Sequence, residues 1–280
     1  MSNSSNPLAQ YFRQPAIYLR LPSGGSYYPK GALEVTTNGE YPVYPMTALD
    51  EITYRTPDAL FNGQAVVNVI QSCVPNIKNA WVMPSIDLNT VLTSIRIASY
   101  GSNLGVESQC PACGEENEYE ADLRLLLDSI QPVDFSAPLN FGDLTIIFKP
   151  MTYQDSNRNS SLLFEQQKTI ESVYASDLDE AKKMEVLNTA MAQITELTMK
   201  ALKHNIAAIK TPTDIVVDID FIEEFLRNCD RDTFNKLRAH IIKLRESSEI
   251  PPLKIKCSSC EHQFEQQLTL DQTSFFVSAS

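Results

Sequence analysis

Two Cys-x-x-Cys pairs constrain this chain more than any other feature of its sequence. The first pair is Cys110 and Cys113, the second is Cys257 and Cys260, and 143 residues separate Cys113 from Cys257. A structural zinc ion takes four ligands in a tetrahedron, with thiolate sulfurs about 2.3 Å from the metal, and one such pair supplies only two. We therefore expect the four cysteines to bind one structural zinc ion together.

The residues around both pairs predict a strand, a tight turn and a second strand. The first such segment begins at Val106 and the second at Leu253, and Gly114 suits a turn with positive φ. Two pairs of this kind are usually about 15–20 residues apart. A longer separation is physically allowed, because closure entropy grows only logarithmically with loop length and a folded insert can hold its ends close. The sequence thus predicts a zinc ribbon split by a long insertion.

The rest of the chain is predicted to be mainly helical. Apolar residues recur at helical spacing near 47–54, 64–73 and 85–98, and again from 177 to 209 and after 232. Residues 16–21 and 41–45 favour extended structure, and 144–148 favour a strand. We expect an α+β fold in which a mainly helical domain is inserted into a split four-cysteine zinc ribbon. The expected parts are an N-terminal extended or β arm (1–46), a helical segment (47–105), the split zinc ribbon (106–124 and 253–272) and the inserted mainly helical domain (125–252).

One apolar stripe on the longest predicted helix has two interpretations. It comprises Met184, Leu187, Met191 and Ile194, and continues through Leu197 or Thr198 to Ala201. The simpler interpretation is packing inside a helical hairpin, and the alternative is a coiled-coil seam that faces a partner. A basic face on the last helix, with Lys236, Arg238, Lys243 and Arg245, is expected to be solvated.

Composition excludes several classes of partner. Lys and Arg total 23 against 35 Asp and Glu, a formal net charge of −12, which repels phosphate backbones, so we expect no nucleic acid as partner. No stretch approaches the roughly 20 apolar residues that cross a bilayer, and the N-terminus lacks the plan of a signal peptide, so we expect no membrane contact and folding in a cytoplasm. Paired cysteines there favour metal binding over structural disulfides.

Nothing in the sequence predicts an enzyme. The three histidines, His204, His240 and His262, adjoin no recognisable nucleophile motif, and four thiolates would leave a zinc ion no open position for catalysis. We expect no catalytic residue and no cofactor beyond structural zinc. His262 could replace a thiolate, but its own pair already supplies two ligands. Cys73 and Cys229 lie in apolar helical contexts and are expected in the core.

A thiol oxidoreductase is a further alternative for the cysteines. A thioredoxin-like redox pair sits where a strand meets a helix, whereas each pair here is followed by residues typical of a strand. Metal binding is therefore the favoured interpretation.

The N-terminal part of the chain carries several ordered motifs between about residues 17 and 124. They are Tyr18-Leu-Arg-Leu-Pro-Ser-Gly-Gly25, Asn38-Gly-Glu-Tyr-Pro-Val-Tyr-Pro-Met46, Thr56-Pro-Asp-Ala-Leu60, Asn62-Gly63, Ser72-Cys-Val-Pro-Asn76, Met83-Pro-Ser-Ile-Asp87 and Cys110-Pro-Ala-Cys-Gly114. In these motifs the chain resembles the baseplate hub and hub assembly proteins of T-even-type contractile-tailed bacteriophages.

The resemblance implies a non-enzymatic role in building the tail tip. The expected partners are other phage tail and baseplate proteins, and the expected locations are the host cytoplasm during assembly and the baseplate of the virion tail. The alternative is a zinc-ribbon module that binds nucleic acid or assists transcription. Lys254 and Lys256 favour that alternative, whereas Glu107, Glu115 and Glu116 oppose it.

The predicted N-terminal arm is also expected to contact another tail protein. It carries Tyr27, Tyr28, Tyr41 and Tyr44, which we expect to be exposed, and several prolines that limit self-pairing. The alternative is that this segment folds back as an edge of the chain's own core.

Overall fold

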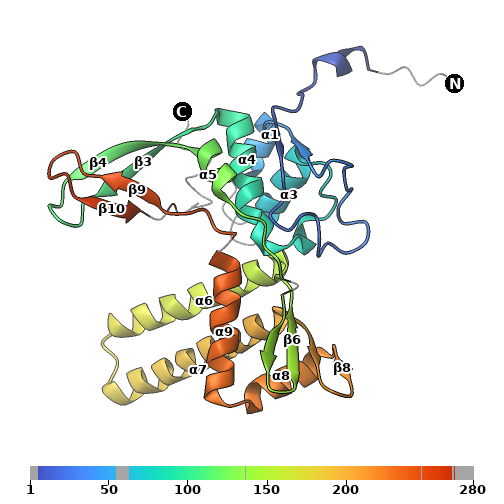
Figure 1. Ribbon diagram of the computed structural model, residues 1–280. Helices are drawn as coiled ribbons and strands as arrows, with labels where there is room; N and C mark the ends of the chain where they lie inside the picture. Colours follow the sequence, from blue (N-terminus) through green and yellow to red (C-terminus); the bar gives the residue numbers. More distant parts are fainter. Residues whose placement is uncertain (1–5, 55–62, 136, 247, 267, 269–280) are drawn as a thin grey trace.

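The computed structural model describes residues 6–54, 63–135, 137–246, 248–266 and 268. Helices and strands are mixed, and the buried side chains form two hydrophobic clusters. Two β-hairpins project together from the body that holds the first cluster, and a helical body holds the second (Figure 1). This mixed architecture agrees with the expected combination of helices and strands.

The N-terminal body surrounds the first cluster. Strands β1 (Ile17–Leu19) and β2 (Tyr41–Val43) pair antiparallel, and helices α1 (Ala48–Tyr54), α3 (Gln64–Cys73) and α4 (Leu88–Tyr100) pack around them. Short 3-10 turns η2 (Ala80–Val82) and η3 (Ser85–Asp87) complete this part, and a further turn, η1 (Pro7–Tyr11), precedes it in the chain. The predicted helices near 47–54, 64–73 and 85–98 are confirmed, because their apolar faces have this cluster to bury against. The fully buried side chains include Val66, Val69, Ile70, Val91 and Ile95.

Residues 17–43 belong to this body and do not form a free arm. Leu19, Tyr41 and Val43 are 4%, 1% and 0% exposed, respectively. The expectation of exposed tyrosines is wrong for Tyr41, whereas Tyr27 is 40% exposed and Tyr28 and Tyr44 are half-buried. The segment forms an edge of the chain's own core, as in the alternative, and its contact with another tail protein stays a prediction. The segment is buried because successive side chains of a strand point to opposite sides. The inward side of each short strand is apolar, and α4 packs against it. Tyr18, on the outward side, is 64% exposed.

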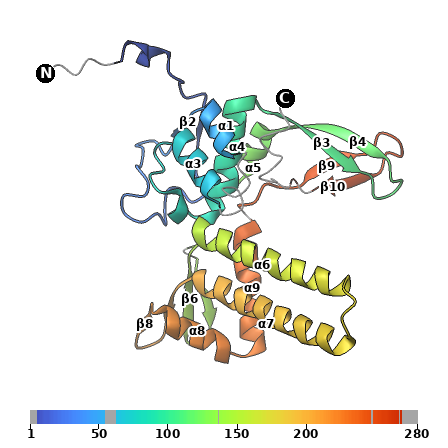
Figure 2. The same cartoon turned by 180° about the vertical axis from the view of Figure 1, so that it is seen from behind.

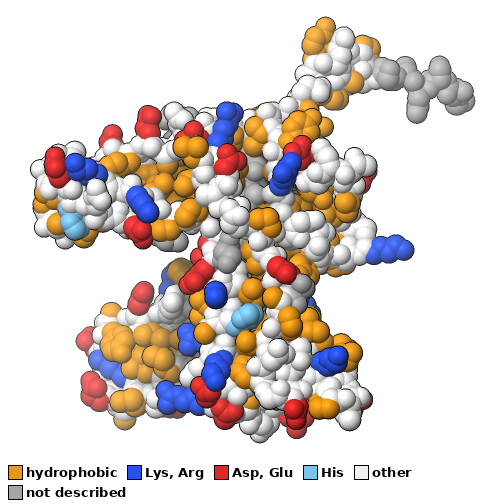
Figure 3. All heavy atoms as spheres, in the orientation of Figure 1, with side chains coloured by type: hydrophobic (Ala, Val, Ile, Leu, Met, Phe, Trp, Pro, Cys, Tyr) orange, Lys and Arg blue, Asp and Glu red, His pale blue; other side chains and the backbone are white. Residues whose placement is uncertain are grey.

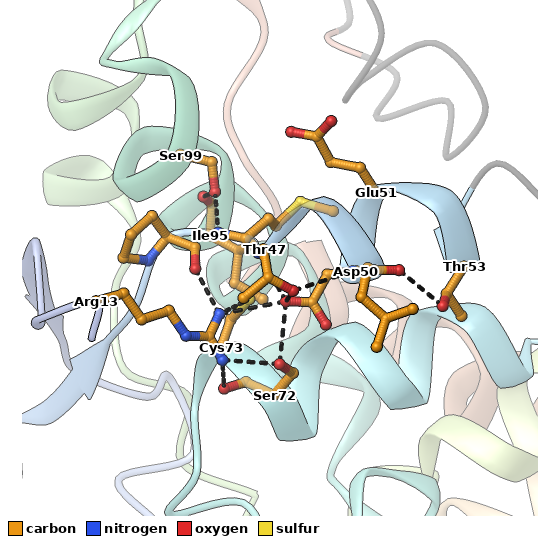
Figure 4. Close-up of polar contacts among 12 residues, drawn as sticks. Arg13, Thr47, Asp50, Glu51, Thr53, Ser72, Cys73, Ile95 and Ser99 are labelled. Carbon is orange, nitrogen blue, oxygen red and sulfur yellow. Dashed lines mark hydrogen bonds and ion pairs between the residues drawn. The ribbon is translucent and has the colours of Figure 1, made fainter. Parts of the chain in front are cut away.

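Arg13 fastens the start of the chain to this body (Figure 4). Its guanidinium donates hydrogen bonds to the Pro45 carbonyl at 2.5 Å and to the Asp50 carboxylate at 3.2 Å. It also donates to the carbonyl and the hydroxyl of Ser72, both at 2.8 Å. Before this anchor, η1 lies away from the body, and Tyr11 is 77% exposed (Figure 1). The chain thus becomes part of the body at Arg13.

The second cluster lies between a four-stranded antiparallel sheet and helices. The sheet order is β5 (Leu139–Phe141), β6 (Leu144–Phe148), β7 (Ile206–Lys210) and β8 (Ile215–Val216). The helices are α6 (Tyr153–Tyr174), α7 (Glu180–His204), α8 (Ile219–Asn228) and α9 (Arg231–Glu246). The predicted strand at 144–148 and the last helix are confirmed. The cluster includes Phe135, Ile146, Phe148, Ile206, Ile222 and Leu237.

The longest predicted helix ends earlier than expected. Helix α7 stops at His204, and residues up to 209, which we expected to be helical, form strand β7 instead. Ile206, Ala208 and Ile209 are buried where β7 pairs with β6 and β8. Sheet pairing across the cluster therefore overrides the helical spacing of these few residues.

The apolar stripe of α7 is buried only in part. The two helices lie side by side in both views (Figures 1 and 2), and Ala190 and Leu197 are buried. Met184 and Met191, by contrast, are 58% and 54% exposed. The expected packing inside a hairpin is wrong for these two residues. Figure 3 shows apolar side chains gathered over the same two helices on the visible face.

The two remaining hairpins come from distant parts of the sequence. The first is β3 (Asn103–Gln109) with β4 (Glu116–Asp122), which α5 (Leu123–Ser129) follows, and the second is β9 (Leu253–Lys256) with β10 (Gln263–Gln266). Both views show the hairpins lying beside each other (Figures 1 and 2). Residues 267 and 269–272 of the predicted ribbon lie outside the described residues.

Candidate metal centre

The turns of the two hairpins have the same backbone geometry. In the first, the Cys110 N–H donates to the Glu115 carbonyl at 2.9 Å, and the Gly114 N–H donates to the Cys110 carbonyl at 2.9 Å. In the second, the Cys257 N–H donates to the His262 carbonyl at 2.9 Å, and the Glu261 N–H donates to the Cys257 carbonyl at 3.0 Å. We call each of these turns, residues 110–115 and 257–262, a knuckle. Each knuckle presents its two cysteines at the tip of its hairpin.

The tips of the hairpins meet, and all four cysteine sulfurs lie within 4.8 Å of one another. The Sγ atoms of Cys110 and Cys260 are 3.7 Å apart, as are those of Cys113 and Cys257. Each of these close pairs joins one knuckle to the other. Cys110 and Cys257 are buried, whereas Cys113 and Cys260 are exposed. The structure therefore brings together all four residues that the sequence predicts as metal ligands.

The spacing of the sulfurs fits a metal site better than disulfides. A disulfide holds its sulfurs about 2.0 Å apart, and the six cysteines here are all free. Four thiolates at about 2.3 Å from a central zinc ion would lie about 3.8 Å from one another, by the geometry of a tetrahedron. The closest sulfur pairs, at 3.7 Å, match that edge. The donor set is thus suited to a tetrahedral ion that binds thiolates.

A model for the family described as T4 bacteriophage base plate protein matches residues 32–277. The chain belongs to this base plate family. The match includes both knuckles and most of both hydrophobic clusters, and it confirms the resemblance to baseplate proteins of T-even-type phages that the N-terminal motifs indicate. No curated protein and no solved structure matches the chain significantly.

Electrostatics at this base plate protein's cysteine cluster favour a bound cation. The backbone N–H groups of Cys260 and Ser259 stabilise the thiolate of Cys257 and lower its pKa to about 6. The backbone N–H of Glu115 favours the thiolate of Cys113, but hydrogen bonds with the three neighbouring sulfurs outweigh it and raise the pKa of Cys113 to about 12. Four crowded sulfurs therefore resist ionising together unless a positive charge lies among them.

Sequence reasoning missed the polar residue that links the two knuckles. Asn117 is 6% exposed at the start of β4, and its amide reaches both Cys257 and Ser258 of the other hairpin. Two further bonds join the hairpins, from the Tyr119 hydroxyl to the Lys256 carbonyl at 3.1 Å and from the Ser108 hydroxyl to Gln266 at 2.8 Å. The available signal was strand alternation, which places Asn117 on the inward side of a strand whose outward side is acidic.

The other singled-out residues lie outside the cluster. His262 stacks on Phe264, with ring centroids 6.2 Å apart, and takes part in the knuckle through its backbone, which bonds to the Cys257 N–H and to the Cys260 thiol. Cys73 is fully buried in the first hydrophobic cluster, as expected. Cys229 is only half-buried, so its expected place in the core is wrong, because it follows the last turn of α8.

Proposed function

We propose that this protein is a non-enzymatic structural or assembly protein of the baseplate hub in a contractile-tailed phage. The observation that carries the proposal is the family match over residues 32–277. The matched family is described as T4 bacteriophage base plate proteins, so in this proposal the chain helps to build the tail tip by contacting other baseplate proteins. The expected sites of action are the host cytoplasm during assembly and the virion tail.

One structural zinc ion, held by the four clustered cysteines, is part of this proposal. Each hairpin consists of two strands, and isolated two-stranded hairpins are marginally stable in water. A metal that joins the hairpins would supply the missing stability. In this scheme residues 106–124 and 253–272 form the split ribbon, 125–252 form the insert, 47–105 form the helical segment, and 1–46 precede them.

The exposed apolar stripe of α7 supports a role in a larger assembly. Met184 and Met191 are more than half exposed on α7. The residues one helical turn after each of them, Asn188 and Thr195, are uncharged. Large apolar side chains grouped on a surface are typical of protein interfaces. Other baseplate proteins are therefore the proposed partners.

A nucleic-acid-binding zinc ribbon is the alternative function. Lys254 and Lys256 are exposed on β9, which favours it, but the exposed side of β4 carries Glu116, Glu118 and Glu120. With a net charge of −12, the chain repels phosphate, so we propose that it does not bind nucleic acid. Membranes are not proposed as partners either. No helix in the described part of the chain has the length and apolar character of a membrane span.

Mass spectrometry of purified virions beside infected-cell lysate tests the role in the baseplate. The chain should co-purify with tail proteins, either in virions as a structural subunit or in tail intermediates as an assembly factor. Its absence from both fractions would contradict the proposal. A sequence-specific DNA dissociation constant at or below about 10⁻⁸ M, the range of specific DNA-binding proteins, would favour the alternative.

A further inference from the structure

The two hairpins share the backbone geometry of their knuckles, but their side chains differ where the hairpins meet. When the two segments are aligned in sequence so that their cysteines coincide, Asn117 corresponds to Phe264 and Pro111 corresponds to Ser258. Asn117 and Ser258 contact each other across the hairpins. The equivalent pair on the other side, Phe264 and Pro111, cannot form the same contact, because proline has no backbone N–H and phenylalanine has no acceptor.

Asn117 uses its whole amide group at this junction. Its Nδ2 donates to the carbonyl of Glu115, in its own knuckle, at 3.0 Å and to the sulfur of Cys257, in the other, at 3.6 Å. Its Oδ1 accepts from the backbone N–H of Ser258 at 3.0 Å and from the Ser258 hydroxyl at 2.6 Å. Two donors and two acceptors are the full capacity of an asparagine side chain.

These bonds fix the relative placement of the two halves. The Glu115 carbonyl also accepts the N–H of Cys110, so Asn117 is tied to the knuckle that carries Cys110. Ser258 follows Cys257 directly, so the same side chain is tied to the second knuckle as well. Because Asn117 is 6% exposed, water competes little for these bonds.

We propose that Asn117 is the positioning residue of the metal centre, which sets the two knuckles in register and donates a hydrogen bond to the ligand sulfur of Cys257. The inference rests on the proposed zinc site. Groups that orient metal ligands from outside the coordination shell typically change metal affinity 10- to 100-fold when they are removed. Asn117 would act in this way from a strand that supplies no ligand itself.

The test compares Asn117→Ala with a matched control, Glu116→Ala, in the full chain. Glu116 is the exposed neighbour on the same strand. Zinc dissociation constants come from competition with a chromogenic chelator, and cobalt in place of zinc gives visible bands that report the symmetry of a thiolate site. We expect Asn117→Ala to weaken zinc binding about 10- to 100-fold and to alter the cobalt bands, and Glu116→Ala to do neither.

A third variant covers the case in which Asn117→Ala fails to fold. Asn117→Asp has the same shape and keeps the acceptor for Ser258 but replaces the donor to Cys257 with a negative charge, so we expect a folded chain with weakened zinc binding. Wild-type zinc affinity in either folded Asn117 variant would overturn the inference while leaving the proposed zinc site intact. Failure of the wild-type chain to bind zinc would instead overturn the zinc site itself.

Discussion

Gly114 and Glu261 occupy the same position in the two knuckles, and both have left-handed backbone, with φ of 77° and 60°. In each case the N–H donates to the carbonyl of the first cysteine, which closes the turn. Glycine adopts this conformation without a steric penalty, whereas a residue with a Cβ pays about 1–2 kcal/mol. The second knuckle is therefore closed by a strained residue.

Glu261→Gly should stabilise the second knuckle by about 1 kcal/mol, because it relieves this strain. The loss of the ion pair between Glu261 and Lys256, at 3.3 Å on the surface, should change little. Gly114→Ala should have the opposite effect, and its cost comes from the backbone alone, since a Cβ there would meet no atom within 4 Å. Urea unfolding of the metal-loaded variants measures both changes. Equal stability of Glu261→Gly and wild type would show that the turn is not strained.

Cys257→Ser should abolish stoichiometric zinc binding and destabilise the paired hairpins by several kcal/mol, because at such sites metal-binding energy is folding energy. Cys73→Ala is the matched control, since Cys73 is fully buried far from the cluster in sequence and should cost about 1–2 kcal/mol while zinc stays bound. Elemental analysis and thermal melts of both variants check this. Zinc retained at one per chain in Cys257→Ser would contradict the ligand assignment.

Asp87 should make stability depend on pH. Burial raises the pKa of its carboxyl to about 6, although hydrogen bonds from Ser23 and Tyr28 offset part of that rise. The folded state therefore binds a proton more tightly than the unfolded state. The protonated carboxyl therefore contributes about 3 kcal/mol to the free energy of unfolding. This contribution is fully present below about pH 4 and is lost as the pH rises through 6.

Asp87→Asn removes this titration and keeps the side-chain shape. The unfolding free energy of wild type minus that of Asp87→Asn should fall between pH 4 and pH 7, as measured by urea titrations across that range. A difference that is constant with pH would refute the assignment. Taking the difference cancels acid effects that both proteins share, such as protonation of the cysteine cluster.

Truncation should separate the first twelve residues from the rest of the N-terminal segment. Removing residues 1–12 should leave stability nearly unchanged, because Tyr11 and Phe12 are 77% and 58% exposed. Arg13→Ala should cost about 1–2 kcal/mol, since the partly buried acceptors around its guanidinium lose their donor. Removing residues 1–46 should give insoluble protein, because Tyr41 leaves the core. Solubility and the helical circular dichroism signal of the three proteins test these expectations. A soluble, folded 47–280 fragment would contradict the placement of residues 17–43 in the core.

The double substitution Met184→Lys and Met191→Lys should impair assembly without unfolding the chain. Both side chains are more than half exposed, and lysine is a good helix former, so the thermal midpoint should change by no more than a few degrees. A charged stripe should, however, prevent an apolar partner from packing there. Complementation of phage lacking the wild-type gene measures the effect, and Lys182→Met is a control for the neighbouring face. Full complementation by the double variant would show that the stripe is not an interface.

The local features of this fold were predictable because they depend on neighbouring residues. Helices α3 and α4 have apolar residues at helical spacing, and Gly101, with φ of 90°, lies at the C-terminal end of α4. The Cys-x-x-Cys spacing likewise predicts each knuckle, because the turn's own backbone bonds define it. The four ligand residues could be named for the same reason, since tetrahedral zinc requires two such pairs.

The sequence by itself determined several of the helices, both cysteine hairpins and which four cysteines belong together. Only the tertiary structure decided which apolar residues are buried. Tyr41 and Met184 show this. A strand or helix has several faces, and the packing of elements distant in sequence decides which face is buried. The same holds for Asn117, whose partners Cys257 and Ser258 lie in the other hairpin. Such contacts depend on how two separately folded hairpins meet, and local spacing carries no information about that.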